Sequence, residues 1–363
     1  MAQRRGYAIV ALAAAVVLVA AGAAAKGTDG RGVLSVDERL QGSYPAGSVA
    51  YVRVRGKAHD VSRKARGGNL SLRFKPRAGL YRVSVYQRPC QQADCAKLEA
   101  PVDACSERVS VYAGEGVRVT AVTRAGKGCS MRVAEPPAFP SIRRVRAVRR
   151  YIRGRAVSSF ALIDTHGRFY GFAPHRRYVT ASVVKAMILV ARLRQIGNRM
   201  PSASDRAVLD PMIQVSDNHD ASVAYRWVGD GGLRAVGKLA HMRDLVVPGG
   251  SWGNVYFSAA DQARLFRVID KLVPPRSRGY ARHLLSSIVS YQRWGFSRYS
   301  LARGWRTFFK GGWRQTGRGS LVHEAALFER RGRRFSLAVL TDGNPSHAYG
   351  TATLRGVASR IFR

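Results

Sequence analysis

The alternation of apolar and polar residues between positions 47 and 133 predicts β-strands. Side chains of a strand point alternately to its two faces, so a period of two is expected where one face is buried. Glycine, proline or asparagine stands at the ends of these segments. Short strands at this spacing predict a small antiparallel β-sandwich or barrel. The segments with this pattern are 49–56, 69–76, 79–87, 108–114 and 116–124.

A helical period replaces the alternation after residue 140. Three prolines close together in 134–144 mark a linker. Val145, Val148 and Ile152 then recur at helical spacing among seven arginines, which predicts a basic amphipathic helix. We interpret its arginines as a solvated helix face, with membrane binding as the alternative.

The remaining pattern runs from strands through helices and back to strands. Two strand-like runs within 157–172 flank an Asp-Thr-His-Gly turn, and a long apolar helix starts at Ser182. This order predicts an α+β domain with one antiparallel sheet that receives strands from both ends of the segment. The further helices are expected at 204–214, 218–228, 231–240, 258–272, 278–290 and 346–361, and the strands at 305–313, 320–330 and 333–343.

A chain of 363 residues is long enough for two domains. Arg4 and Arg5, the apolar run 7–21 and small residues before Ala25 have the features of an export signal. An uncleaved membrane anchor is the alternative, because the run is barely long enough to span a bilayer. The predicted parts are a signal peptide (1–25), a β-sandwich-like domain (26–135), a linker with the first helix (136–155) and an α+β domain (156–363).

Four cysteines lie within 40 residues in the predicted sandwich. They are Cys90, Cys95, Cys105 and Cys129. An even number in an exported protein predicts two disulfides, with three possible pairings. A zinc site formed by all four thiolates is the alternative, which the absence of paired C-x-x-C motifs disfavours.

The net charge of +39 indicates an affinity for polyanions. No nucleic-acid-binding motif is present, and an exported chain would leave the cytoplasm. Anionic cell-wall polymers and acidic lipid headgroups are therefore the expected partners of this charge. The net charge thus indicates where the protein acts but does not indicate which reaction it catalyses.

A single lysine interrupts the apolar helix that starts at Ser182. Every residue from Val183 to Ala191 is apolar except Lys185, which is one turn from Ser182 on the same helical face. The positive end of the helix dipole and burial both favour a neutral amine here. A neutral amine can take a proton from the serine hydroxyl. The alternative is a lysine whose ammonium reaches solvent.

Two later motifs favour the interpretation of Ser182 and Lys185 as a nucleophile and its base. Ser216-Asp217-Asn218 lie between predicted helices, and Lys310-Gly311-Gly312 lie on a predicted strand. With S-x-x-K at Ser182, the chain over 156–363 resembles the superfamily of class A β-lactamases and penicillin-binding proteins, which includes D-Ala-D-Ala peptidases. The resemblance implies a β-lactamase/transpeptidase-like fold. The short spacing between the first two motifs implies a reduced helical subdomain.

The resemblance also implies a role for each matching residue. Ser182 would be the acylated nucleophile and Lys185 its base. Ser216 would pass the proton to the leaving nitrogen, and Lys310 would hold this relay and attract a substrate carboxylate. The substrate would be a β-lactam or a D-Ala-D-Ala-type cell-wall peptide, without a cofactor.

Other residues would bind the substrate. Asn218 would bond a substrate amide, and the backbone N–H groups of Ser182 and Trp313 would form the oxyanion hole. Gly311 stands where the family has a Thr or Ser hydroxyl that binds the substrate carboxylate, next to Gly312. Arg314 or Thr316 is a candidate substitute for that hydroxyl.

A second departure concerns hydrolysis of the acyl-enzyme. Class A β-lactamases use an Ω-loop glutamate to position water, yet no glutamate occurs between Glu135 and Glu324. The corresponding region, 241–261, offers only Asp244 and Asp261, and Asp261 is better explained as a helix cap after Ser258. Acylation is thus expected without efficient deacylation. An acylation-only or non-catalytic cell-wall sensor is the alternative function.

Other chemistries have weaker support. The eight histidines show no metal-ligand spacing, so no metal site is predicted. A Ser-His-Asp triad would need a G-x-S-x-G turn or an equivalent, which Ser182 lacks.

Overall fold

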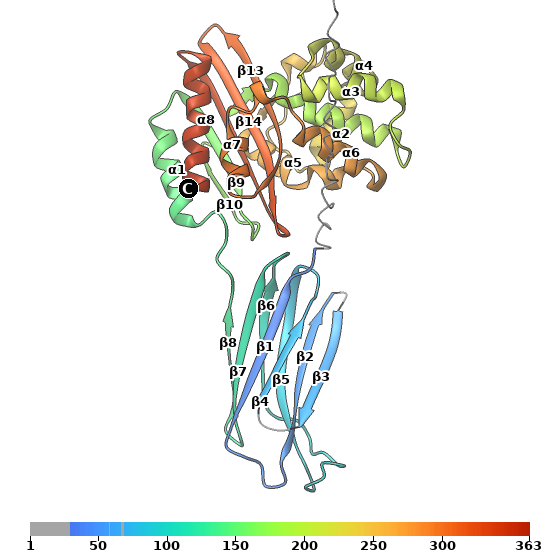
Figure 1. Ribbon diagram of the computed structural model, residues 1–363, viewed down its shortest axis with the longest axis vertical. Helices are drawn as coiled ribbons and strands as arrows, with labels where there is room; N and C mark the ends of the chain where they lie inside the picture. The colour runs from blue at the N-terminus through green and yellow to red at the C-terminus, as the bar shows by residue number, and fades with distance from the viewer. Residues whose placement is uncertain (1–29, 58, 67–68) are drawn as a thin grey trace, which may run out of the picture.

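In the computed structural model, which describes residues 30–57, 59–66 and 69–363, a slender β-sandwich stands below an α+β domain (Figure 1). The two domains have separate hydrophobic cores. The predicted export signal, 1–25, lies outside the described residues. Within the described ranges, no helix is long and apolar enough to cross a membrane.

The sandwich consists of two four-stranded sheets, in the orders β4-β1-β7-β8 and β3-β2-β5-β6. Strands β1 and β7 are parallel, and the other neighbours are antiparallel. All five predicted strands are present. Their bounds are Ser48–Gly56 (β2), Asn69–Phe74 (β4), Gly79–Pro89 (β5), Val102–Val111 (β6) and Gly116–Arg124 (β7).

Three strands of the sandwich were not predicted: β1 (Val33–Gln41), β3 (His59–Arg66) and β8 (Gly128–Ala134). Strands β3 and β8 are edge strands without a fully buried residue. The sequence of β3 contains few apolar residues, whereas β8 alternates, with Met131 and Val133 packed on the core, but is short. In β1 the charged Glu38 is buried, where its carboxylate accepts hydrogen bonds from Gln87 and Thr123. A buried carboxylate interrupts the apolar pattern on which the prediction depends.

The predicted pair of disulfides is present in the sandwich. One links Cys90 to Cys95, and the other links Cys105 on β6 to Cys129 on β8. Because β6 and β8 belong to different sheets, the second disulfide joins the two sheets covalently. All four cysteines are therefore paired, and a zinc site made of their thiolates is excluded.

The α+β domain is built on an antiparallel sheet in the order β10-β9-β15-β14-β13. Strands from both ends of the segment enter it, as predicted. The bounds are Val157–Ile163 (β9), Phe169–Phe172 (β10), Arg306–Thr316 (β13), Gly319–Arg330 (β14) and Arg333–Asn344 (β15). Strands β11 (Arg177–Val179) and β12 (Tyr256–Ser258) form a separate small sheet.

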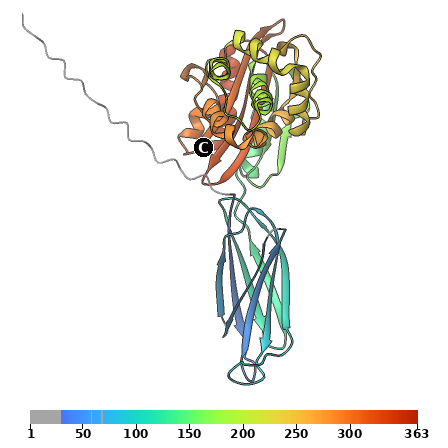
Figure 2. The same cartoon turned by 90° about the vertical axis from the view of Figure 1, so that its right-hand side faces the viewer.

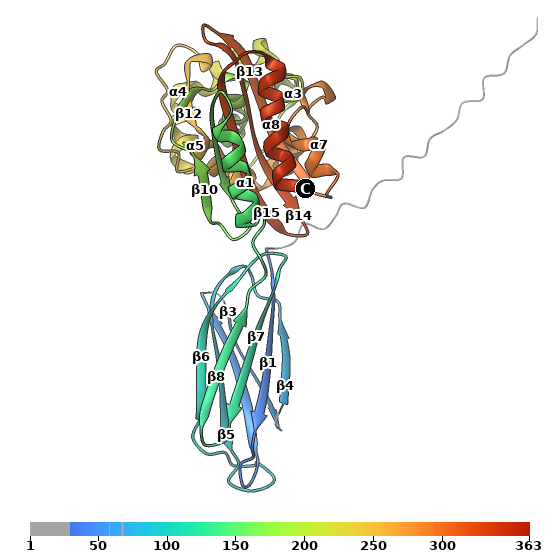
Figure 3. The same cartoon turned by 90° about the vertical axis from the view of Figure 1, so that its left-hand side faces the viewer.

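Helices cover both faces of the five-stranded sheet. Figure 3 looks onto α1 (Ile142–Arg153) and α8 (His347–Phe362), which lie side by side over one face. The predicted amphipathic helix is α1, and its apolar residues Val145, Val148 and Ile152 are buried. The other helices lie mainly on the opposite face, towards the viewer in Figure 2.

That helical layer contains most of the predicted helices. Helix α4 spans both predicted segments, with a break at Gly229, and α6 ends four residues before the predicted limit. Helix α7 (Phe296–Leu301) lies beside α8. The helices of the layer are Lys185–Ile196 (α2), Ala203–Gln214 (α3), Asn218–Leu239 (α4), Ala259–Leu272 (α5) and Arg278–Ser286 (α6).

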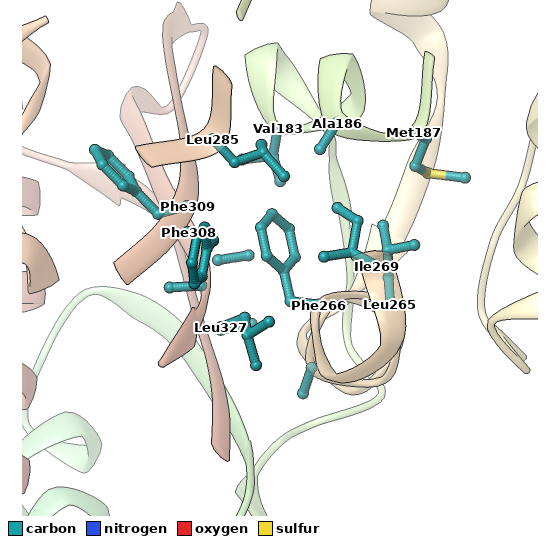
Figure 4. Packing of buried hydrophobic residues seen from close by; sticks show 14 of the residues in the cluster. Val183, Ala186, Met187, Leu265, Phe266, Ile269, Leu285, Phe308, Phe309 and Leu327 are labelled. Carbon is teal, nitrogen blue, oxygen red and sulfur yellow. The ribbon is translucent and has the colours of Figure 1, made fainter. Parts of the chain in front are cut away.

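Helix α2 is central to the core of this domain (Figure 4). Residues 185–191 are all buried, as expected for a helix that is apolar nearly all round. Residues from α5, α6 and the sheet surround it, including Phe266, Leu285 and Phe308. This packing fixes the start of α2, where Ser182 and Lys185 lie.

A small polar cluster joins the two domains. Tyr112 of the sandwich stacks on His166 of the α+β domain, with ring centroids 3.6 Å apart. The buried Glu115 carboxylate lies 3.1 Å from His166 Nε2 and 2.6 Å from Arg333 Nε. Gly114 has φ +71°, and a Cβ there would lie 1.9 Å from the Arg331 carbonyl oxygen, so only glycine fits.

Candidate active site

Ser182 lies in the 3-10 turn η1 (Ala181–Val184) that leads into α2. It is partly exposed, while Ala181 and Val183 on either side are buried. Ala181 has φ +43°, which is unusual for a residue with a Cβ. Backbone strain of this kind tends to occur at functional sites. The turn thus presents a single hydroxyl at the surface of a buried helix.

Strand β13 approaches the backbone of Ser182 closely. A Cβ on Gly312 would lie 2.8 Å from the Ser182 nitrogen and 2.9 Å from the Val183 nitrogen. Any side chain at this position would push the strand away from η1. The second glycine of the Lys-Gly-Gly motif is therefore required by the close approach of β13 to the serine.

Lys185, the first residue of α2, is fully buried. Its ammonium donates hydrogen bonds to the Ser216 carbonyl (2.6 Å), the Ser216 hydroxyl (3.2 Å) and Asn218 Oδ1 (2.7 Å). Burial lowers the pKa of Lys185 to about 8, against the opposing effect of the Asp217 and Asp220 charges. Near pH 7, part of the Lys185 population is therefore unprotonated and able to accept a proton.

The Ser216 hydroxyl lies between two buried lysines. Lys310 Nζ, from β13, lies 3.1 Å from Ser216 Oγ, on which Lys185 also converges. Complete burial and the nearby charge of Lys185 hold the pKa of Lys310 well below its usual value. Ser216 itself has φ +62°, a second strained position at the site. Lysines with lowered pKa values around one hydroxyl are suited to proton transfer.

The structure brings together all three predicted motifs. Lys185, Ser216, Asn218 and Lys310 share one hydrogen-bond network, and Gly312 contacts the backbone of Ser182. Across the described residues, neither lysine is hydrogen-bonded to Ser182 Oγ. Catalytic hydrogen bonds often tighten only in the Michaelis or transition-state complex, so the arrangement is compatible with Lys185 as the base.

Trp252 is a site residue that the motifs did not identify. Lys185 Nζ lies 5.1 Å from its ring centroid, and the indole N–H donates to Ser222 Oγ at 3.1 Å. The ring therefore limits solvent access to Lys185. Trp252 lies in a glycine-rich segment without periodicity, and no sequence signal links it to Lys185.

Gly311 has an explanation that the sequence did not show. A Cβ at this position would lie 2.8 Å from Cη2 of Trp294 and 3.2 Å from Cζ2. The space of the expected hydroxyl group is thus occupied by an indole ring. Thr316 is hydrogen-bonded to the Gly319 carbonyl within the β13–β14 turn, at 2.9 Å. Arg314 is exposed next to Trp313 and remains the candidate for carboxylate binding.

The two aspartates in the region expected for a water-positioning carboxylate have structural partners. Asp261 is completely buried and forms a capping box with Ser258, as predicted. It also accepts hydrogen bonds from the backbone N–H groups of Arg243 and Asp244. The Asp244 carboxylate binds the Ser258 hydroxyl and His175. Both carboxylates hold the fold of this region.

In the part of the chain that the structure describes, no group of three or more His, Cys, Asp or Glu side chains is arranged to hold a metal ion.

Comparison with known proteins agrees with the motifs. Residues 201–363 match the model of a family described as the β-lactamase enzyme family. No curated protein sequence matches the chain. Solved structures with a similar fold include a β-lactamase from Sphaerobacter thermophilus, with a TM-score of 0.51 and 17% identity over 60% of this chain and 94% of that chain.

Two other solved structures give the same result. PBP-A has a TM-score of 0.51 at 17% identity, covering 62% of this chain and 97% of its own. A β-lactamase from Chitinophaga pinensis has a TM-score of 0.52 at 12% identity, covering 61% and 97%. The α+β domain therefore has the fold of these β-lactamases and of PBP-A, as the resemblance implied, and its residues 201–363 also match the β-lactamase family model.

Proposed function

We propose that the α+β domain is a serine acyl-transfer enzyme that forms a covalent ester at Ser182 with a β-lactam or a D-Ala-D-Ala-type cell-wall peptide. The observation that carries this proposal is the pair of buried lysines, Lys185 and Lys310, on either side of the Ser216 hydroxyl. A purely structural role would not explain two buried lysines in contact with one hydroxyl, since the burial of lysine is costly.

In the proposed reaction, Ser182 Oγ attacks the carbonyl carbon of the substrate and its proton passes to neutral Lys185. The carbon–oxygen bond forms and the carbonyl oxygen becomes an anion, which the backbone N–H groups of Ser182 and Trp313 stabilise. When the tetrahedral intermediate collapses, the carbon–nitrogen bond breaks. The proton then reaches the leaving nitrogen through the hydroxyl of Ser216, which Lys310 orients.

Substrate binding is assigned to residues around this network. Asn218 would hold a substrate amide through its side chain, whose Oδ1 now accepts from Lys185. Gly311 and Gly312 would let the substrate lie along β13, and Arg314 would attract its carboxylate. The exposed guanidinium of Arg314 is suited to bidentate binding of a carboxylate.

We further propose that the acyl-enzyme is hydrolysed slowly. Support comes from Asp244 and Asp261, whose carboxylates are engaged in the fold, and from the lack of a glutamate between Glu135 and Glu324. A variant of PBP-A, one of the proteins with this fold, has been solved as an acyl-enzyme complex with penicillin G. A long-lived acyl-enzyme here would also serve a sensor, which is the second candidate function.

The place of action is proposed to be outside the cytoplasmic membrane. The predicted export signal and the two disulfides support this location, since disulfides persist in oxidising compartments. The net charge of +39 would favour contact with anionic wall polymers there.

The test is covalent labelling with a fluorescent penicillin. The mature protein is incubated with the probe, and mass spectrometry then identifies the labelled residue. We expect one label on Ser182, absent from Ser182→Ala and slowed at least about a hundred-fold in Lys185→Ala. A wild-type protein that remains unlabelled by penicillins, cephalosporins and acyl-D-alanyl-D-alanine thioesters would refute the proposed acyl transfer at Ser182.

The lifetime of the label separates the two functions. A label that persists for hours after removal of free probe supports slow deacylation or a sensor. Rapid loss of the label, with hydrolysed penicillin as product, would contradict the proposal of slow hydrolysis and indicate that another group positions the water.

A further inference from the structure

A pocket of about 240 Å³ lies beside the Lys-Gly-Gly motif, on the side of β13 that faces Trp294. Three of its aromatic residues come from segments that are distant in sequence, and the exposed Tyr291 adds a fourth. Trp294 precedes α7, Trp313 lies on β13 and His347 begins α8. Gly311 faces Trp294 and Gly312 faces Ser182, so the pocket and Ser182 lie on opposite faces of the edge strand β13, at the same point along it.

The three rings are arranged as the sides of a box. The plane of Trp294 makes angles of 86° with both Trp313 and His347, with centroid distances of 5.9 and 5.6 Å. Trp313 and His347 are themselves inclined at 70°, 6.3 Å apart. Trp313 keeps 38% of its surface exposed, so an open aromatic surface remains for a ligand.

Two residues that line this pocket, Gln292 and His347, each have a buried polar atom without a hydrogen-bond partner among the described residues. Gln292 is only 2% exposed and donates its amide N–H to the Val215 carbonyl at 2.8 Å. Its Oε1 is buried and accepts no hydrogen bond from any residue that the structure describes. Buried acceptors are rarely left unpaired, so a bound group with an N–H or O–H would complete the site. Val215 precedes Ser216, which links this glutamine to the proton relay.

The charge around the pocket favours a neutral ring that bears a carboxylate. Aromatic boxes also bind ammonium groups, but the lining includes Arg314 and no aspartate or glutamate. Burial lowers the pKa of His347, which keeps its ring neutral at neutral pH. The Arg314 contact with the Gly253 carbonyl is long, at 3.5 Å, so this guanidinium is available to an anion.

The volume sets the size of the occupant. A cavity of about 150 Å³ accommodates benzene, so a pocket of about 240 Å³ accommodates a bicyclic ring. A methyl group such as the side chain of alanine would leave most of it empty.

We propose that this pocket binds the leaving-group portion of the acyl donor, and that this portion carries a planar neutral ring with a hydrogen-bond donor. The ring would lie against Trp294 and Trp313, its N–H would donate to Gln292 Oε1, and the leaving-group carboxylate would bind Arg314. This inference rests on the proposed acyl transfer and specifies its substrate class. The resemblance led us to expect a hydroxyl at position 311 that binds the substrate carboxylate. Gly311 and Trp294 provide instead an aromatic surface on which the ring of the leaving group can pack.

The test measures binding without turnover. In the Ser182→Ala protein, calorimetry compares N-acetyl-D-alanyl-D-tryptophan with N-acetyl-D-alanyl-D-alanine. We expect the tryptophan peptide to bind about ten-fold more tightly or better, because its indole is buried against two rings. A 1-methylindole analogue, which lacks the N–H, should lose roughly three- to ten-fold of that affinity.

Variants assign the effect to the pocket. Trp294→Leu and His347→Ala, each in the Ser182→Ala background, should abolish the preference for tryptophan. Trp227→Leu is the matched control, because Trp227 lies on α4 against Arg192 and not in the pocket. Equal affinities for the two peptides, or a preference that survives Trp294→Leu in a protein with an unchanged melting curve, would overturn the inference.

The outcome is independent of the labelling experiment on the wild-type chain. If penicillin labels Ser182 but the two peptides bind equally, the proposal of acyl transfer is supported and the proposed aromatic specificity is wrong. If the preference for the tryptophan peptide appears but no label forms, the proposed binding in the pocket is supported and the proposal of acyl transfer is wrong.

Discussion

The pH dependence of acylation follows from the burial of Lys185. Only the neutral amine can accept the proton of Ser182, and burial lowers the pKa of Lys185 to about 8. Raising the pH from 7 to 9 increases the neutral fraction from about one tenth to about nine tenths. The second-order rate constant of acylation should therefore rise about ten-fold and then level off. A lysine with an ordinary pKa would give a rise of about a hundred-fold, with no plateau below pH 10.

A charge change near Lys185 tests the same reasoning. Asp217 raises the pKa of Lys185 through its negative charge and caps α4 by accepting from the Asp220 N–H. Asparagine caps helices equally well, so Asp217→Asn removes the charge and keeps the cap. The pKa of Lys185 should fall further, and acylation at pH 7 should accelerate roughly two- to five-fold.

Stopped-flow measurement with a fluorescent penicillin, between pH 6 and pH 10, provides these rate constants. Asp94→Asn, on a loop of the sandwich, is the control and should leave the profile unchanged. A rate that is independent of pH, or that still climbs steeply at pH 10, would show that Lys185 is not the base. An Asp217→Asn profile displaced to higher pH would contradict the electrostatic reasoning.

Three further predictions concern stability, the rate of acylation and the arrangement of the domains. Burial raises the pKa of Glu324 to about 8. The contribution of Glu324 to the free energy of unfolding is therefore complete below about pH 4.5 and is lost as the pH rises towards 8. In urea unfolding, Glu324→Gln should thus be about 3 kcal/mol more stable than wild type at pH 7 and equal to it at pH 4. Gly312→Ala places a Cβ 2.8 Å from the Ser182 nitrogen and should slow acylation by about a hundred-fold or more, as followed by labelling; a normal rate would show that the close approach is unnecessary. Glu115→Ala removes the carboxylate that Arg333 and the His166 ring share at the domain contact and should lengthen the molecule in small-angle scattering while leaving acylation unchanged. An identical scattering profile would show that the linker alone sets the arrangement.

Local sequence signals were sufficient for the elements that carry the motifs. The start of α2 was predictable because its residues are apolar on every side except at Lys185. Strand β13 was predictable from its apolar residues, and Asp261 from the capping pattern after Ser258. These features depend on residues within one or two turns of each other.

The surroundings of the site could not be predicted, because they depend on contacts between distant residues. Trp294 meets Gly311 through the packing of a loop on a strand, and Trp252 meets Lys185 through the packing of a 3-10 turn on the start of α2. Neither tryptophan belongs to a periodic pattern. Strand β1 was missed for a related reason, since the partners that satisfy its buried Glu38 lie on other strands.

The contact between Gly311 and Trp294 also limits how this site can evolve. Serine at position 311 would supply the hydroxyl that the resemblance led us to expect there, but its Cβ would meet the Trp294 ring at 2.8 Å. Replacement of Trp294 by a smaller residue creates no clash, and it opens the space that a serine needs. The order of the two substitutions therefore matters, and the route through position 294 first is the accessible one. Each residue makes the effect of a mutation at the other depend on the genetic background.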